Sequence, residues 1–144
     1  MTRGTSAGFG RRFAALIYDS LLIGALLLVY TVLIVLARGG AVTRDNAGIW
    51  WYAYCAGEIV VIGAYYVINW VRSGQTLGMR AWRLRAVDAS GKPLALARAA
   101  LRFLCGFLAW APAALGVLWL YLDVEHLALH DRLSRTRVVR LSGP

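Results

Sequence analysis

Three long apolar stretches constrain this chain more than any other feature. Phe13–Leu36 has 24 residues and one charged side chain, Asp19, and Ile49–Trp70 has 22 residues and one charged side chain, Glu58. About 20 apolar residues are enough for a helix that crosses the roughly 30 Å hydrocarbon layer of a bilayer. The sequence is 60% hydrophobic and 16% charged, whereas soluble domains have about 45–50% and about 25%. We therefore expect an all-α polytopic membrane protein with one domain over residues 1–144.

The third stretch, Leu101–Leu122, has a less simple pattern. Arg102 lies at its start and Pro112 lies near its middle. A proline inside a helix removes a hydrogen bond and bends or breaks the helix. We expect either one kinked span or a re-entrant hairpin of two half-length helices, in addition to the two full transmembrane helices.

The basic residues predict which segments face the cytoplasm. Of 16 lysine and arginine residues, three precede residue 13, two lie in residues 37–48, seven in residues 71–102 and four after residue 122. Lysine and arginine favour the cytoplasmic side of short loops. We expect a cytoplasmic N-terminus, a cytoplasmic loop at about residues 71–100 and a basic tail, residues 123–144, on the same side. This requires an even number of crossings, and a third full span, which would place the tail outside, stays open as the alternative.

The basic loop also indicates what the chain contacts. The formal net charge is +9, and the charges lie between apolar runs. Clusters of basic residues beside membrane helices bind anionic lipid headgroups, so we expect the lipid bilayer to be the partner and expect no nucleic-acid binding.

A histidine pair follows the last apolar stretch. His126 and His130 are four residues apart, which would place both imidazoles on one helix face and permit a metal pair. An amphipathic helix with solvated polar side chains accounts for the same spacing. We therefore predict no metal site and no cofactor.

Residues 82–94 predict a small cytoplasmic β-hairpin. Apolar and basic side chains alternate over Trp82–Val87, the turn residues Asp88–Gly91 follow, and Lys92–Leu94 resumes the extended pattern. Isolated hairpins are marginally stable. The strand-like tail segment Thr136–Leu141 would supply a third strand.

Two carboxylates inside the apolar stretches are candidate functional groups. Asp19 lies two turns into the first stretch, and Glu58 lies near the middle of the second. A carboxylate at the bilayer centre costs about 2.5–3.5 kcal/mol on insertion scales, so it should face protein or water. Burial raises the pKa of a carboxyl and a nearby guanidinium lowers it, so such a group can carry protons or cations near neutral pH. Arg12, seven residues before Asp19, would share its helix face, either to tune that pKa or to form a structural ion pair.

Four segments of the chain carry motifs that occur in a fixed order. They are Ala7–Asp19, Gly74–Arg80 (GQTLGMR), Asp88–Arg102 (DASGKPLALARAALR), and Leu129–Leu133 (LHDRL) with Thr136 and Val138–Val139. Together they resemble the RDD family of bacterial membrane proteins, named for one arginine and two aspartates. The resemblance places these signature residues on Arg12, Asp19 and Asp131. Ser134–Arg135 and Met79 depart from the Ala-Gly pair and the lysine that are usual in the family.

The resemblance implies a compact helical domain in the bacterial cell (inner) membrane, and it leaves two functional hypotheses. Some family members are sodium/proton antiporters, and others accompany larger membrane assemblies. On the first hypothesis the chain is a homo-oligomeric monovalent cation/proton antiporter in which Asp19 and Glu58 bind ions and Arg12 sets their pKa. No nucleophile and base stand near one another in the sequence, so we do not expect an enzyme.

On the second hypothesis the chain is a non-catalytic accessory or assembly subunit of a larger membrane complex. Arg12, Asp19 and Asp131 then form internal salt bridges that hold the fold together. Ala53 and Gly57, which are four residues apart, would provide a small-residue face for close packing against a partner helix.

Overall fold

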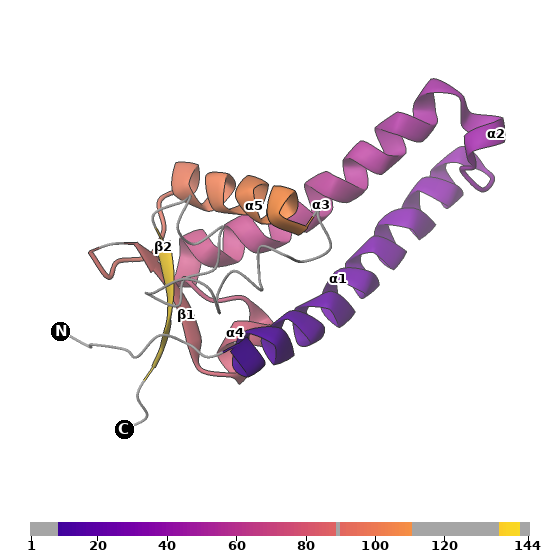
Figure 1. Ribbon diagram of the computed structural model, residues 1–144. Helices are drawn as coiled ribbons and strands as arrows, with labels where there is room; N and C mark the ends of the chain where they lie inside the picture. Colours follow the sequence, from indigo (N-terminus) through magenta and orange to yellow (C-terminus); the bar gives the residue numbers. More distant parts are fainter. Residues whose placement is uncertain (1–8, 89, 111–135, 142–144) are drawn as a thin grey trace.

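The helices and strands of the chain form a long helix pair with a small mixed cluster at one end (Figure 1). The structure is a computed structural model that describes residues 9–88, 90–110 and 136–141. In chain order the elements are α1 (Phe9–Arg38), α2 (Arg44–Ala47), α3 (Ile49–Ser73), α4 (Leu77–Ala81), β1 (Leu84–Asp88), α5 (Leu96–Trp110) and β2 (Thr136–Arg140).

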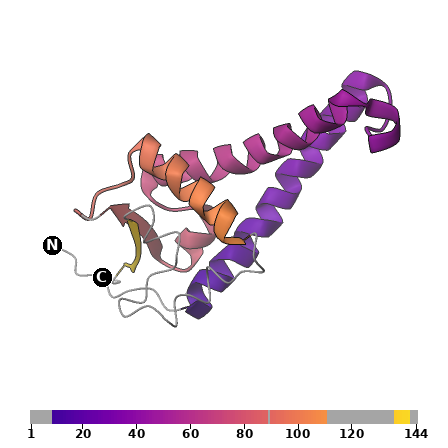
Figure 2. The same cartoon turned by 45° about the horizontal axis from the view of Figure 1, so that its top comes forward.

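Helices α1 and α3 are the two predicted spans. Both are long and apolar enough to cross a membrane, and only 6% of the most apolar window of each is buried. The core helix of a soluble protein would be mostly buried, so the exposed apolar surface is compatible with a membrane protein. The helices meet at the α2 end and separate toward the other end, where α4, α5 and the strands lie (Figures 1 and 2).

The turn that joins α1 to α3 is fixed by Asn46. The Asn46 side chain accepts a hydrogen bond from the Thr43 N–H at 3.0 Å and donates one to the Ala41 carbonyl at 2.9 Å. The Arg38 guanidinium donates to the Asn46 carbonyl at 3.1 Å. Gly48 then adopts a positive φ of 53°, which glycine tolerates better than other residues, and α3 begins at the next residue.

The buried core lies at the opposite end, among α1, α3, α4, α5 and the strands. Its members are apolar side chains from each of these elements and from the segment before α5: Ala15, Trp70, Met79, Leu84, Ala86, Leu94, Ala99 and Val138. Burial of apolar area is worth about 25 cal/mol per Å². Hydrophobic stabilisation is therefore concentrated where the loop after α3 folds back onto α1.

The two strands come from distant parts of the chain. β1 and β2 pair antiparallel, with Leu84 opposite Arg140 and Asp88 opposite Thr136. The hairpin partner expected for β1, Lys92–Leu94, is not a strand. Pro93 lacks the N–H that a strand needs to donate, and the tail supplies β2 in its place.

The turn after β1 is organised by Asp88. Its Oδ1 accepts hydrogen bonds from the N–H groups of Ser90 at 2.8 Å and Lys92 at 3.0 Å, and from the Ser90 hydroxyl at 2.7 Å. The hydrogen bond from the Ser90 side chain, followed by that from the Lys92 backbone, lowers the pKa of the Asp88 carboxyl below its ordinary value. A side chain that accepts bonds from its own turn favours a compact turn over a continued strand.

Helix α5 begins at Leu96, before the residue-101 start of the predicted third apolar segment. Leucine and alanine dominate Leu96–Leu101, and both are strong helix formers. Figure 2 shows α5 crossing the C-terminal half of α3 at an angle, and Ala99 and Arg102 are buried while Leu101 is exposed. The choice between a kinked span and a re-entrant hairpin concerns residues 111–122, which lie outside the described residues.

Candidate functional site

The Asp19 carboxylate joins three segments of the fold. Asp19 lies on α1 and is 3% exposed. Its Oδ1 accepts hydrogen bonds from the Tyr65 hydroxyl of α3 at 2.6 Å and from the Gly78 N–H of α4 at 2.8 Å. Its Oδ2 accepts one from the Thr76 hydroxyl at 2.5 Å. Burying a carboxylate is costly unless it is hydrogen-bonded, and these three donors offset that cost.

Thr76 connects the carboxylate to the start of α4. Its backbone is extended, with φ −73° and ψ 171°, and its hydroxyl oxygen accepts the Met79 N–H at 3.1 Å. The same hydroxyl donates its proton to Asp19. Threonine at an N-cap satisfies one of the N–H groups that a helix leaves without an internal partner. A single fully buried hydroxyl therefore both starts α4 and attaches it to α1.

Gly78 allows α4 to approach the backbone of α1. A Cβ atom at this position would overlap the Ala15 carbonyl oxygen and would lie 2.9 Å from the Asp19 Cγ atom. Only a residue without a side chain fits this close approach. The glycine is thus required for the N–H of residue 78 to reach the carboxylate.

Gly74 and Gln75 attach the same segment to β1. Gly74 ends α3 in the left-handed conformation, with φ 70°, and its N–H donates to the Trp70 carbonyl at 3.0 Å. Its carbonyl accepts the Ala86 N–H at 2.7 Å, and the Gln75 side chain donates to the Leu84 carbonyl at 2.6 Å. The segment Gly74–Gly78 therefore links α3, β1 and the Asp19 carboxylate.

The pairing of Arg12 with Asp19 that the spacing of the two residues suggested stays a prediction. Arg12 is half-buried on α1, two turns before Asp19. Within the described part of the chain, Tyr65, Thr76 and Gly78 donate hydrogen bonds to the Asp19 carboxylate. The third signature residue, Asp131, lies outside the described residues.

Glu58 belongs to a second polar cluster, between α1 and α3. The Tyr54 side chain stands one helical turn before Glu58, and its hydroxyl hydrogen-bonds with the Thr31 hydroxyl at 2.8 Å. The Tyr30 hydroxyl donates to the Tyr54 carbonyl at 3.2 Å, and the two tyrosine rings stack with centroids 5.6 Å apart. Two tyrosines and a threonine thus form a polar contact between α1 and α3, one helical turn from Glu58.

Gly57 packs against α1 of the same chain, whereas the sequence suggested that it would contact a helix of a partner protein. A Cβ atom at Gly57 would overlap the Tyr30 hydroxyl of α1. The small residue therefore makes room for the tyrosine that closes the α1–α3 contact.

Arg102 is a buried cation that the sequence analysis did not select as a site residue. It is 3% exposed, and its guanidinium donates to the Thr136 hydroxyl of β2. It also lies 5.0 Å from the centre of the Trp70 ring of α3, and a desolvated cation–π contact contributes about 2 kcal/mol. Arg102 therefore joins α5, β2 and α3 in the way that Asp19 joins α1, α3 and α4.

The residues that hold Asp19 carried different sequence signals. Thr76 and Gly78 stand in the motif GQTLGMR, whose spacing marks a helix start after a tight turn. Tyr65 had no such signal, because its role depends on how α3 packs against α1. Over residues 9–88, 90–110 and 136–141, the structure brings together no group of three or more metal-ligating side chains, and His126 and His130 lie outside these ranges.

Comparison with known proteins matches most of the chain to one protein family. The sequence model described as "RDD family" matches residues 6–135. An uncharacterized protein of Rickettsia prowazekii (strain Madrid E) is 33% identical over 86 residues, which are 59% of this chain and 47% of that protein. The match thus spans about half the length of this relative. No solved structure matches the chain.

Replacing Asp19 with asparagine is expected to destabilise the fold. The asparagine amide would keep one acceptor oxygen, so one of the three buried donors would lose its partner, at a cost of about 1–3 kcal/mol. Tyr65→Phe removes one donor and leaves the carboxylate two others, so it should cost less, about 0.5–1.5 kcal/mol. The free energy of unfolding in mixed micelles, followed by circular dichroism, measures both. Equal stability of Asp19→Asn and wild type would contradict the assigned role.

Gly78→Ala is expected to push α4 away from α1. The added methyl group meets a backbone carbonyl that cannot rotate aside, and overpacking of this kind costs about 1–3 kcal/mol. Gly24→Ala is the matched control, because a Cβ at Gly24 has no atom within 4 Å among the described residues. The same unfolding measurement should show a loss for Gly78→Ala and none for Gly24→Ala; similar values for the two variants would disprove the close approach.

Proposed function

This chain belongs to the RDD family, and from that premise we propose that it is a non-catalytic accessory subunit of a larger membrane complex. The proposal rests on one observation: groups of the same chain already hydrogen-bond to the carboxylate of Asp19, the first signature aspartate. Asp19 accepts hydrogen bonds from Tyr65, Thr76 and Gly78. Each of these bonds holds one segment of the fold to another, so the carboxylate acts as a structural residue.

A transport carboxylate has a different requirement. To exchange a proton for a cation it must release and rebind its partners in each cycle. Each buried donor left without an acceptor costs about 1–3 kcal/mol, and here release would also detach the start of α4 from α1. This cost supports a fixed role for Asp19 over ion exchange at that residue.

One cluster favours a second function, cation/proton exchange by a homo-oligomer. Tyr54 and Thr31 offer two hydroxyls between the two long helices, and the carboxylate of Glu58 belongs to the next helical turn after Tyr54. Oxygen ligands of this kind suit hard cations. On this alternative the ion-binding residue is Glu58, and Asp19 keeps its structural role.

We place the chain in the bacterial inner membrane with α1 and α3 spanning it and with the N-terminus in the cytoplasm. The charge distribution supports this orientation, because seven lysine and arginine residues lie in residues 71–102 and two in residues 37–48. Arg72, Arg80 and Arg83 lie at the end of α3 and in the segment that follows it. On this orientation they contact the anionic headgroups of the cytoplasmic leaflet.

Flux and assembly measurements together test the proposal. Purified protein in liposomes with an interior pH dye should show no proton flux when sodium, potassium or lithium is added. The wild-type chain, cross-linked in its native membrane, should run on a native gel as part of a larger complex, and Asp19→Asn should reduce the amount of that complex.

The variants separate the alternatives. Cation-dependent flux that Glu58→Gln abolishes and folded Asp19→Asn retains would establish the second function. Flux that disappears in Asp19→Asn while the folded fraction stays at the wild-type level would overturn the structural role of Asp19. A chain that runs alone on the native gel would exclude the accessory-subunit proposal.

A further inference from the structure

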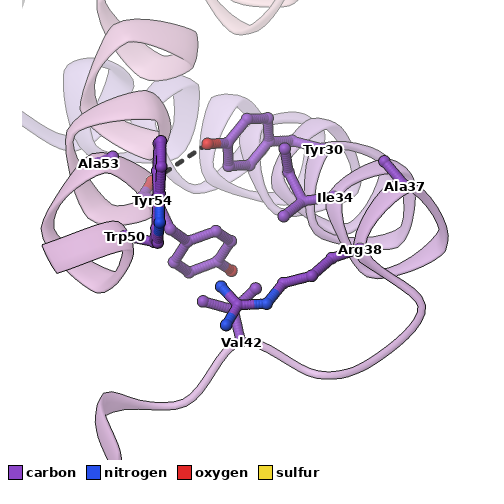
Figure 3. A pocket seen from close by; sticks show the side chains of 8 residues that line it. All are labelled: Tyr30, Ile34, Ala37, Arg38, Val42, Trp50, Ala53 and Tyr54. Carbon is purple, nitrogen blue, oxygen red and sulfur yellow. Dashed lines mark hydrogen bonds between the residues drawn. The ribbon is translucent and has the colours of Figure 1, made fainter. Parts of the chain in front are cut away.

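A groove lies between α1 and α3 at the α2 end of the helix pair, away from Asp19 and from the strands (Figure 3). Its volume is about 550 Å³, within the range of about 300–1,000 Å³ that is typical of ligand pockets. The rings of Tyr30, Trp50 and Tyr54 and the aliphatic side chains of Ile34 and Val42 line it. The lining is therefore mainly apolar and comes from both long helices and the turn between them.

One cation borders this apolar groove. Arg38 is the last residue of α1 and lines the groove, and Figure 3 shows its guanidinium extended toward Val42. Among the described residues its hydrogen-bond partner is the Asn46 carbonyl, which holds the side chain in place. A guanidinium has five N–H donors, so it retains donors for an anion after it has bonded to Asn46.

The position of the groove defines the shape of its ligand. Trp50 lies at the first turn of α3 and Arg38 at the end of α1, and tryptophan and tyrosine side chains settle at the headgroup level of a bilayer. Ile34 and Tyr30 lie one and two helical turns before Arg38 in α1. The groove thus runs from the headgroup level toward the hydrocarbon layer, polar at one end and apolar along its length.

We propose that this groove binds one anionic phospholipid. An acyl chain lies against Tyr30, Ile34 and Tyr54, and the Arg38 guanidinium donates hydrogen bonds to the headgroup phosphate. Arginine matches phosphate oxygens in a bidentate geometry, so the one guanidinium of Arg38 is enough to bind a headgroup phosphate. This site is separate from the basic loop of residues 71–102, and it does not depend on the proposed accessory function.

Quenching of Trp50 by brominated lipids tests the proposal. The full chain is reconstituted in vesicles that contain increasing fractions of brominated phosphatidylglycerol or brominated phosphatidylcholine. The chain has six tryptophans, so the difference between wild type and Trp50→Phe isolates the signal of Trp50. Half-maximal quenching is expected at an approximately fivefold lower fraction of phosphatidylglycerol than of phosphatidylcholine.

Three variants define the site. Arg38→Gln keeps a donor for the Asn46 carbonyl and should remove the preference for the anionic lipid. Arg44→Gln, in the same turn but outside the groove lining, should retain it. Ala53→Phe fills the groove and should weaken quenching by both lipids.

Equal half-maximal fractions for the two lipids in the wild-type chain would overturn the proposal. The same loss of preference in Arg38→Gln and Arg44→Gln would also overturn it, because the effect would then reflect general surface charge. Absence of any Trp50 quenching would show that no acyl chain enters the groove, and unchanged quenching in Ala53→Phe would show that the chain lies elsewhere.

Discussion

A carboxylate that is buried away from water needs hydrogen-bond donors from the protein in place of water molecules. Two other segments of the chain supply these donors to Asp19. Tyr65 reaches it from α3, and Thr76 and Gly78 reach it from the start of α4. The loop after α3 can therefore fold back onto α1 only if its hydroxyl and its glycine are correctly placed. The packing of β1 follows from this, because Gly74 and Gln75 in the same loop hold β1 by hydrogen bonds to its backbone.

The two ends of the helix pair are stabilised in different ways. At the strand end, two buried charged residues organise the fold: Asp19 joins α1, α3 and α4, and Arg102 joins α5, β2 and α3. At the α2 end, the stacked rings of Tyr30 and Tyr54, hydrogen bonds of their hydroxyls, and the close approach of Gly57 to Tyr30 hold the helices together. Buried charged residues thus fix the end that carries the tail strand, whereas aromatic rings and uncharged hydroxyls join the helices beside the groove at the other end.

The sequence predicted the parts of the fold that depend on local pattern. The apolar lengths of Phe13–Leu36 and Ile49–Trp70 were sufficient to locate α1 and α3, because the thickness of a bilayer imposes their length. The cost of a carboxylate among apolar residues singled out Asp19. Its partners were harder to predict, because Tyr65 stands in a helix that carries no motif at that position. The tail segment Thr136–Leu141 was expected to add a strand to the hairpin, and β2 does pair with β1, but no local pattern defines the register between such distant segments. The spacing of Arg12 and Asp19 did not identify the donors to the carboxylate, because helical spacing places two residues on one face but does not say which neighbour bonds them.

The carboxylate of Asp19 and the hydroxyl of Thr76 stabilise the fold as a pair. A double-mutant cycle with Asp19→Asn and Thr76→Val tests it most directly, with the free energy of unfolding in mixed micelles as the measured quantity. If the two side chains act through their shared hydrogen bond, the cycle should give a coupling energy of about 0.5–3 kcal/mol. Additive effects of the two substitutions, with no coupling between them, would contradict the account.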